Sequence, residues 1–223
     1  SLDIKTGEKI WDINVVDNLV ETESLSSLNE QDPNRDKIIS GGTGVGISMA
    51  PVVYKNKVII GITGVGYGLH VEKDGDNSAL GSVVGVAGRF GRPGFLAAYD
   101  IHSGRQIWQF DTIPEKGWEG KFTNYTADGE VLNRDTYLEK EALAQHPNSA
   151  KYGGGSAWTT PAIDEITNTL FFGTGNPSPQ MSAETRPGDN LYTVSLVALD
   201  ADTGKLKWFY QQVPHDIWGY DVA

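Results

Sequence analysis

The stretch Asp100-Ile-His-Ser-Gly-Arg-Gln-Ile-Trp108 has the pattern D-x3-G-x3-W, which also occurs at residues 3–11 and 200–208. In each copy an aspartate can cap a tight turn and a glycine can take the positive φ that the turn requires. The tryptophan then lies on the strand that follows the turn. Each copy is therefore predicted to be a β-hairpin, and three copies indicate a repeat architecture.

A second pattern precedes the hairpin in two of the three copies. Residues 50–61 and 160–173 each fit a strand, a turn and a second strand. With the hairpin, each unit has about four strands, the composition of a β-propeller blade, which buries its faces by stacking on neighbours. The expected fold is therefore all-β and part of a propeller.

The hairpins lie about 100 residues apart, further than the roughly 40–50 of compact propeller repeats, so long insertions are expected. They fall at residues 14–40, 66–94 and 112–150, and residues 137–145 form the best helix candidate. No domain boundary is evident. Residues 1–223 are expected to form a single partial propeller domain, a fragment of a longer chain.

Composition excludes several function classes. The net charge of −11 argues against a nucleic-acid or anionic-membrane partner, because both need clustered Lys and Arg. The chain has no cysteine, which excludes thiolate catalysis, cysteine zinc sites and disulfides within these residues. The sequence contains no run of about 18 apolar residues, so it predicts no membrane span. The four histidines show no zinc-binding spacing.

The candidate site lies in two nearby stretches, Gly153-Gly-Gly-Ser-Ala-Trp158 and Phe171-Phe-Gly-Thr-Gly-Asn-Pro177. Glycines let the backbone approach a ligand closely, and an indole face offers a stacking platform. The amide oxygen of Asn176, on a Gly-Asn-Pro turn, is a neutral ligand suited to a hard cation. A core tryptophan followed by a turn asparagine explains the same residues equally well.

Together these motifs resemble the quinoprotein dehydrogenases. That family uses pyrroloquinoline quinone (PQQ) in an eight-bladed β-propeller whose blades carry tryptophan-docking motifs. The D-x3-G-x3-W repeats match those docking motifs, and further matches in the family's order are residues 153–158, 173–177, 186–190 and 214–218. The resemblance implies that this chain is part of such a propeller, with long loop insertions.

The resemblance also implies the residues that would bind PQQ. Trp158 matches the indole that stacks beneath the quinone ring. Thr63, Gly64 and Val65 match the segment that runs along the cofactor, and Ser48 lies near the position of a hydroxyl that hydrogen-bonds a quinone carboxylate. Trp158 as a core aromatic, and Thr63 and Ser48 as ordinary strand residues, remain the alternatives.

For the metal, which the resemblance implies to be calcium or a lanthanide, Asn176 matches a ligand of the family. The family's glutamate ligand is missing, since Gly66 or Arg89 falls at its position, depending on how the segment is matched. Acidic residues at 72, 74 and 76 are an alternative source of a ligand. Gly219 stands where the family carries its base. Asp221, two residues later, matches an aspartate that serves as an extra metal ligand in lanthanide-dependent members, so the resemblance makes it a second candidate metal ligand and the candidate catalytic base.

The implied function is oxidation of an alcohol, polyol or sugar hydroxyl by hydride transfer to PQQ. The implied electron acceptor is a cytochrome c or a quinone, and the implied location is the periplasm or another extracytoplasmic space. His215 is chemically able to act as a base, although a structural role is expected. The alternative function is a catalytically inactive propeller that serves as a binding or assembly scaffold. Open blade edges predict self-association of the fragment.

Overall fold

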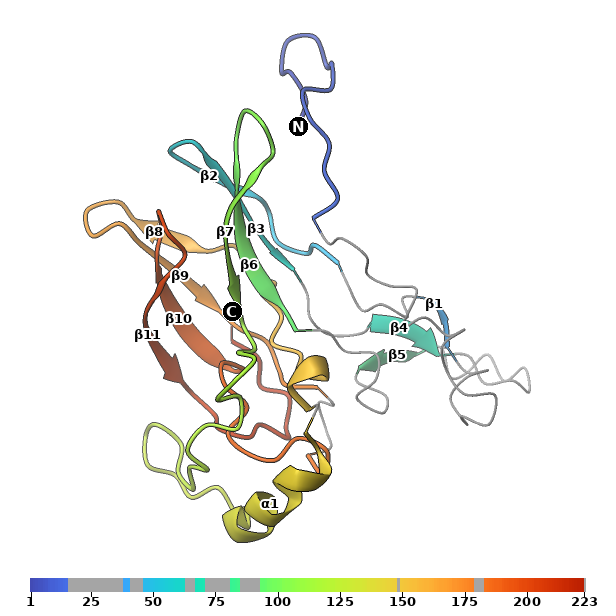
Figure 1. Cartoon of the computed structure of the whole chain (residues 1–223), viewed down its shortest axis with the longest axis vertical. Helices are drawn as coiled ribbons and strands as arrows, with labels where there is room; N and C mark the ends of the chain where they lie inside the picture. The colour runs from blue at the N-terminus through green and yellow to red at the C-terminus, as the bar shows by residue number, and fades with distance from the viewer. Residues whose placement is uncertain are drawn as a thin grey trace.

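Two four-stranded antiparallel sheets form the body of the protein (Figure 1). The computed structural model describes residues 1–15, 38–40, 46–62, 67–70, 81–84, 93–147, 149–178 and 183–222. The first sheet has the order β2-β3-β6-β7 and the second the order β11-β10-β9-β8. The strands are β2 (Val52–Tyr54), β3 (Lys57–Ile62), β6 (Phe95–Asp100), β7 (Gln106–Asp111), β8 (Ala162–Asp164), β9 (Thr169–Gly173), β10 (Ser195–Asp200) and β11 (Leu206–Gln211).

Both sheets confirm the predicted units of strand–turn–strand followed by a hairpin. The hairpins keep the same register, with Ala98 opposite Trp108 in one sheet and Ala198 opposite Trp208 in the other. Each hairpin also has an irregularity one residue after that pair. In the first copy of the motif, a single antiparallel bridge joins Leu2 to Lys9. The repeat in the sequence is therefore also a repeat in the structure.

The three hairpin turns use the residues that the motif predicts. In the second copy, Asp100 Oδ1 accepts hydrogen bonds from the backbone of His102 at 3.1 Å and of Ser103 at 2.8 Å. Gly104 takes a φ of 70°, and its N–H reaches the Asp100 carbonyl at 2.9 Å. The glycines of the other copies have φ values of 73° and 68°. An aspartate cap and a left-handed glycine therefore define all three turns.

Two motif tryptophans pack against the turn of the next unit. Trp11 Nε1 donates to the Ile101 carbonyl at 2.9 Å, and Trp108 Nε1 donates to the Ala201 carbonyl at 3.3 Å. Their rings cover glycines: a Cβ at Gly104 would lie 2.8 Å from Trp11, and one at Gly204 would lie 2.5 Å from Trp108. Each turn thus leaves room for the indole of the unit before it.

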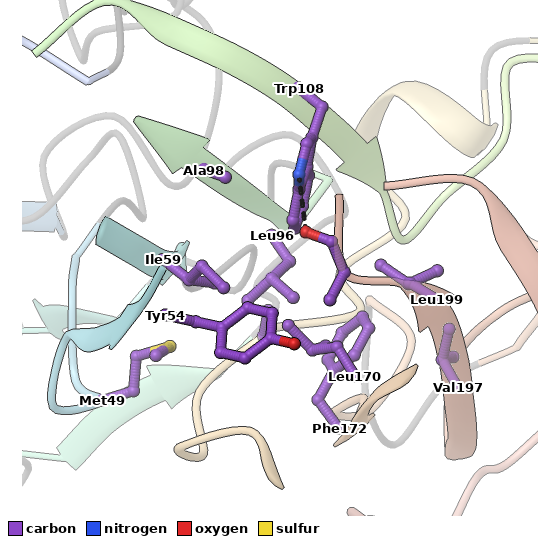
Figure 2. Close-up of a cluster of buried hydrophobic side chains, with 12 residues drawn as sticks. Met49, Tyr54, Ile59, Leu96, Ala98, Trp108, Leu170, Phe172, Val197 and Leu199 are labelled. Carbon is purple, nitrogen blue, oxygen red and sulfur yellow. Dashed lines mark hydrogen bonds between the residues drawn. The ribbon is translucent and has the colours of Figure 1, made fainter. Parts of the chain in front are cut away.

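The main core lies between the two sheets (Figure 2). Trp108 enters it from β7 together with buried aliphatic side chains of both sheets, including Ile59, Leu96, Leu170 and Leu199. A smaller cluster on the other face of the first sheet contains Ile62, Phe95 and Tyr99. The first sheet is therefore buried on both faces, as a central blade of a stack would be.

The insertions are only partly irregular. Residues 136–142 form α1 (Thr136–Ala142), capped by Asp135, and 3-10 turns follow as η5 (Leu143–Gln145) and η6 (Ser149–Tyr152). The helix prediction for residues 137–145 is thus confirmed. The other two insertions contribute a three-stranded sheet that the sequence did not predict, formed by β1 (Ile38–Ser40), β4 (Tyr67–His70) and β5 (Gly81–Val84). Within the described ranges, no helix has the length and apolarity needed to cross a bilayer.

Candidate functional site

The triple-glycine stretch and the Gly-Asn-Pro turn run side by side as a short antiparallel ladder. An isolated bridge joins Gly154 to Pro177. The ladder bonds run from Gly155 N to Asn176 O at 2.9 Å, from Gly175 N to Ser156 O at 2.8 Å and from Ser178 N to Gly153 O at 3.0 Å. The two stretches of the candidate site are thus one structural unit.

The glycines of this ladder make room for other parts of the same protein. Gly154 and Gly155 have φ values of 80° and 69°. A Cβ at Gly154 would lie 2.6 Å from the Asn176 carbonyl oxygen, and one at Gly155 would lie 2.8 Å from Thr112 Oγ1. Close approach of a ligand was the expected reason for these glycines, but at these two positions the close neighbour is the protein backbone or a neighbouring side chain.

Trp158 follows the ladder directly and is half-buried. Ser48 Oγ donates to the Trp158 carbonyl at 3.3 Å, so two of the predicted cofactor residues are in contact. Ala157 N donates to the Ile62 carbonyl at 3.1 Å, which places the end of β3 beside the tryptophan. Trp158 Nε1 is buried and has no hydrogen-bond partner in the described part of the chain.

Several predicted positions lie outside the described residues. They are Thr63, Gly64 and Val65 of the cofactor segment, the two residues that replace the family's glutamate, Gly66 and Arg89, and the acidic residues at 72, 74 and 76. Ile62, which accepts the bond from Ala157, is the last described residue before this segment.

Asn176 and Asp221 form a reciprocal pair, although they are 45 positions apart in the sequence. Asp221 N donates to Asn176 Oδ1 at 2.9 Å, and Asn176 N donates to Asp221 Oδ1 at 2.9 Å. Asn176 is only 4% exposed. A Cβ at Gly175 would lie 2.8 Å from Asp221 Oδ1, so that glycine makes room for the carboxylate. The structure therefore brings the two predicted metal ligands together.

The environment makes Asp221 a stronger base than an exposed aspartate. Burial raises the pKa of Asp221, and the negative charge of Asp216 raises it further, whereas the hydrogen bond from Asn176 N lowers it. A raised pKa improves a carboxylate as a proton acceptor once it is ionised. The pair also supplies two oxygen donors of the kind that hard cations prefer.

These oxygens are too few to hold a cation by themselves. Ca²⁺ takes about six to eight oxygen ligands. Among the described residues, no three His, Cys, Asp or Glu side chains gather in a metal-binding arrangement. Asn176 and Asp221 can thus form one side of a cation site, with the remaining ligands supplied by a bound cofactor, water or other residues.

Behind Asp221 lies a buried charged cluster that the sequence did not predict. Arg186 and Asp216 are both fully buried, and Arg186 Nη2 donates to the Asp216 carbonyl at 2.6 Å. His215 contacts the Gly188 carbonyl through Nδ1 at 2.7 Å. Burial lowers the pKa of His215, and the positive charge of Arg134 lowers it further, so the ring is neutral near pH 7. The signals in the sequence were the stretches 186–190 and 214–218, which suggested only a family match.

The cluster continues to α1. Arg134 Nη1 donates to Asp189 Oδ1 at 2.8 Å, and Arg134 Nε donates to Glu139 Oε1 at 2.7 Å. Glu139 Oε2 also accepts from Gly188 N at 2.9 Å. These contacts attach the insertion at residues 112–150 to the loop that carries Arg186.

The chain is similar to known proteins in both sequence and structure. Residues 22–223 match the family described as "PQQ: Glucose/ethanol/alcohol dehydrogenase, beta-propeller domain". The chain is 34% identical over 180 residues to methanol dehydrogenase [cytochrome c] subunit 1 of Methylobacterium organophilum, covering 79% of this chain and 24% of the relative. It is also 34% identical over 179 residues to quinohemoprotein alcohol dehydrogenase of Comamonas testosteroni, covering 78% of this chain and 20% of the relative.

Solved structures show the same fold. Quinohemoprotein alcohol dehydrogenase ADHIIG of Pseudomonas putida HK5 aligns with a TM-score of 0.58 at 27% identity, over 99% of this chain and 24% of that chain. A europium-containing methanol dehydrogenase aligns with a TM-score of 0.58 at 25% identity, over 99% of this chain and 30% of that chain. The chain therefore spans about a quarter of the length of these relatives. It belongs to the PQQ-dependent alcohol dehydrogenase family and has that family's all-β propeller fold.

Proposed function

We propose that this chain forms part of a PQQ-dependent oxidoreductase that oxidises the hydroxyl of an alcohol, polyol or sugar. The observation that carries this proposal is the reciprocal Asn176–Asp221 pair on the ladder that leads to Trp158. The relatives named methanol dehydrogenase and quinohemoprotein alcohol dehydrogenase support it. The chain spans 24% and 20% of the length of these two relatives.

The described residues fit a flat quinone beside Trp158. The indole is half-buried, and its Nε1 is a buried donor without a partner in the described ranges. Trp158 would stack on the PQQ ring, and Ser48 would bind near a carboxylate of PQQ. Thr63, Gly64 and Val65 would run along the cofactor. Once bound, PQQ supplies the two-electron acceptor for the chemistry.

Calcium or a lanthanide is the proposed metal. Asn176 Oδ1 accepts one hydrogen bond and keeps a second lone pair for a cation, and the Asp221 carboxylate lies next to it. The related methanol dehydrogenase that contains europium supports a lanthanide. A cation here would also lower the cost of the buried negative charge on Asp221.

Asp221 is the proposed base, and its replacement is the first test. Asp221→Asn keeps the shape of the side chain but removes the proton acceptor, so kcat is expected to fall about 100-fold or more. Dye reduction by the complete PQQ-loaded protein over a panel of alcohols and sugars measures this loss. Because only the ionised carboxylate of Asp221 can accept the proton, activity should fall as the pH is lowered and Asp221 becomes protonated. Wild-type turnover by Asp221→Asn would assign the base elsewhere.

An inactive scaffold of the same ancestry is the second candidate. Gly219 lacks a side chain at the position of the family's base, and no cluster of three acidic or histidine ligands exists among the described residues. PQQ binding without turnover on any substrate would favour the scaffold. Turnover would exclude it. A protein that binds no PQQ would contradict the enzyme proposal.

The remaining proposals concern architecture and setting. Residues 1–223 would form one partial domain of an eight-bladed ring, in which the contacts of Trp11 and Trp108 are the docking motifs between blades. The electron acceptor would be a cytochrome c, as in the name of one relative, or a quinone. The proposed location is the periplasm or another extracytoplasmic space.

Self-association of this chain is proposed from the outer strand β11. Trp208 and Tyr210 lie on one face of β11, opposite Ala198 and Leu196 of β10, and are 45% and 50% exposed. Tyr210→Lys should shift the chain towards monomer in sedimentation velocity, because a charge on an edge strand opposes pairing. Tyr137→Lys on α1, where the tyrosine is 68% exposed, is the matched control and should leave the distribution unchanged. Equal behaviour of both variants would place any association elsewhere.

A further inference from the structure

The turn that carries Asp221 has an unusual backbone. His215, Gly219 and Asp221 all have positive φ, at 55°, 79° and 51°. For residues other than glycine this conformation is unfavourable and persists only where surrounding contacts enforce it. Two such residues within seven positions therefore require a specific support.

Asp216 provides that support from inside the turn. Its carboxylate is fully buried and accepts backbone hydrogen bonds from Trp218 at 2.9 Å, from Gly219 at 3.1 Å and from Tyr220 at 3.1 Å. The next N–H along the chain is that of Asp221, which donates to Asn176 Oδ1. Asp216 thus orders every backbone donor between Trp218 and the candidate base.

Arg186 holds the backbone carbonyl of Asp216. Its guanidinium is fully buried, with Nη2 bonded to the Asp216 carbonyl at 2.6 Å and Nη1 bonded to Asn190 Oδ1 at 2.6 Å. Asn190 Nδ2 returns a bond to the Arg186 carbonyl at 3.0 Å. Burial lowers the pKa of Arg186 to about 10, so the guanidinium remains cationic at neutral pH and balances the buried carboxylate.

We propose that Asp216, braced by Arg186, is a positioning residue that sets the Asp221 carboxylate against Asn176 for binding the cation. This inference rests on the proposed function, because it assigns the cation to the Asn176–Asp221 pair. Asp216 itself does not touch the cation. It acts through the backbone of residues 218–220, as outer-shell carboxylates orient the ligands of other metal sites.

Asp216→Asn in the full chain is the test. The amide keeps one acceptor oxygen but places an NH₂ group where a second oxygen accepts from Tyr220 N and Gly219 N. With PQQ present, the affinity for Tb³⁺, followed by its luminescence, is expected to fall about 10- to 100-fold. The affinity for PQQ, followed by quenching of tryptophan fluorescence, should change far less. Hydrogen exchange at Asp221 N should accelerate in the absence of any ligand.

Asp189→Asn is the matched control. Asp189 is also a buried carboxylate that accepts backbone bonds, from Lys121 at 2.8 Å and Thr123 at 2.6 Å, and it pairs with a buried arginine. Its carboxylate supports the segment before α1 instead of the Asp221 turn. The Asp189→Asn variant should therefore have a lower melting temperature but no selective loss of Tb³⁺ binding. Equal loss of Tb³⁺ affinity in both variants would reduce Asp216 to a general stabilising residue and overturn the proposal.

The outcomes separate this inference from the proposed function. If the wild-type protein binds neither PQQ nor Tb³⁺, the proposed function is wrong, and exchange at Asp221 N alone decides whether Asp216 positions that residue. Wild-type exchange in Asp216→Asn overturns the positioning role. If Asp216→Asn does not fold, Arg186→Lys takes its place, since lysine keeps the charge but loses one of the two bonds to Asp216 O and Asn190.

Discussion

Replacing Trp158 with alanine is expected to weaken PQQ binding about 100-fold or more. Covering one indole face removes about 100 Å² of apolar surface from water, which is worth about 2.5 kcal/mol, and aromatic stacking adds about 0.5–1.5 kcal/mol. A total of about 3–4 kcal/mol corresponds to about two to three orders of magnitude in Kd. The half-buried position of Trp158 beside the ladder makes this a loss of ligand contact more than of core packing.

Fluorescence titration of the protein with PQQ measures the change. Trp158→Phe should retain much of the affinity, because an aromatic face remains. Trp108→Phe is the control for removal of an indole elsewhere, and it should lower stability while leaving the Kd for PQQ unchanged. Normal PQQ binding by Trp158→Ala would show that the cofactor site has been misplaced.

The second large effect is expected at Trp108. Truncation to alanine should lower the free energy of unfolding by about 3–5 kcal/mol, the usual cost of removing a buried large aromatic. Trp108 is 7% exposed, packs in the core between the sheets and covers Gly204, and its Nε1 bonds to the Ala201 carbonyl. The loss would create a cavity and leave that carbonyl without its indole donor.

Trp208→Ala is the matched control, because Trp208 occupies the same motif position in the next hairpin. It is 45% exposed, so its truncation should cost about 1 kcal/mol or less. Chemical denaturation followed by circular dichroism compares the two variants. Equal destabilisation would contradict the assignment of Trp108 as the tryptophan that joins the two sheets.

Local turn chemistry explains how much of the fold was predictable. The aspartate cap and the glycine of D-x3-G-x3-W define the hairpins through bonds within a few residues, such as those of Asp100 to Ser103. The helix at α1 was predictable for the same reason, since good helix formers follow the Asp135 cap. The sheet formed by β1, β4 and β5 was not, because its short strands come from two separate insertions and one of them contains a glycine at its centre.

The site was only partly predictable. The resemblance to a family predicts Trp158, Asn176, Asp221 and Ser48 as site residues. Arg186 and Asp216 were not assigned any role, because a buried arginine is recognised only from the atoms that surround it. The reason for Gly154 and Gly155 was also misjudged: their missing side chains make room for Asn176 and Thr112.

The sequence by itself determined the repeating hairpins, the four-stranded units and the membership of the chain in a family of all-β propellers. These features depend on residues that are close together along the chain. Only the tertiary structure decided that Asn176 and Asp221 face each other, and that Asp216 and Arg186 hold the turn that carries Asp221. The physical reason is that those contacts join residues 30 and 45 positions apart, and the buried charges are stable only where each finds its partners.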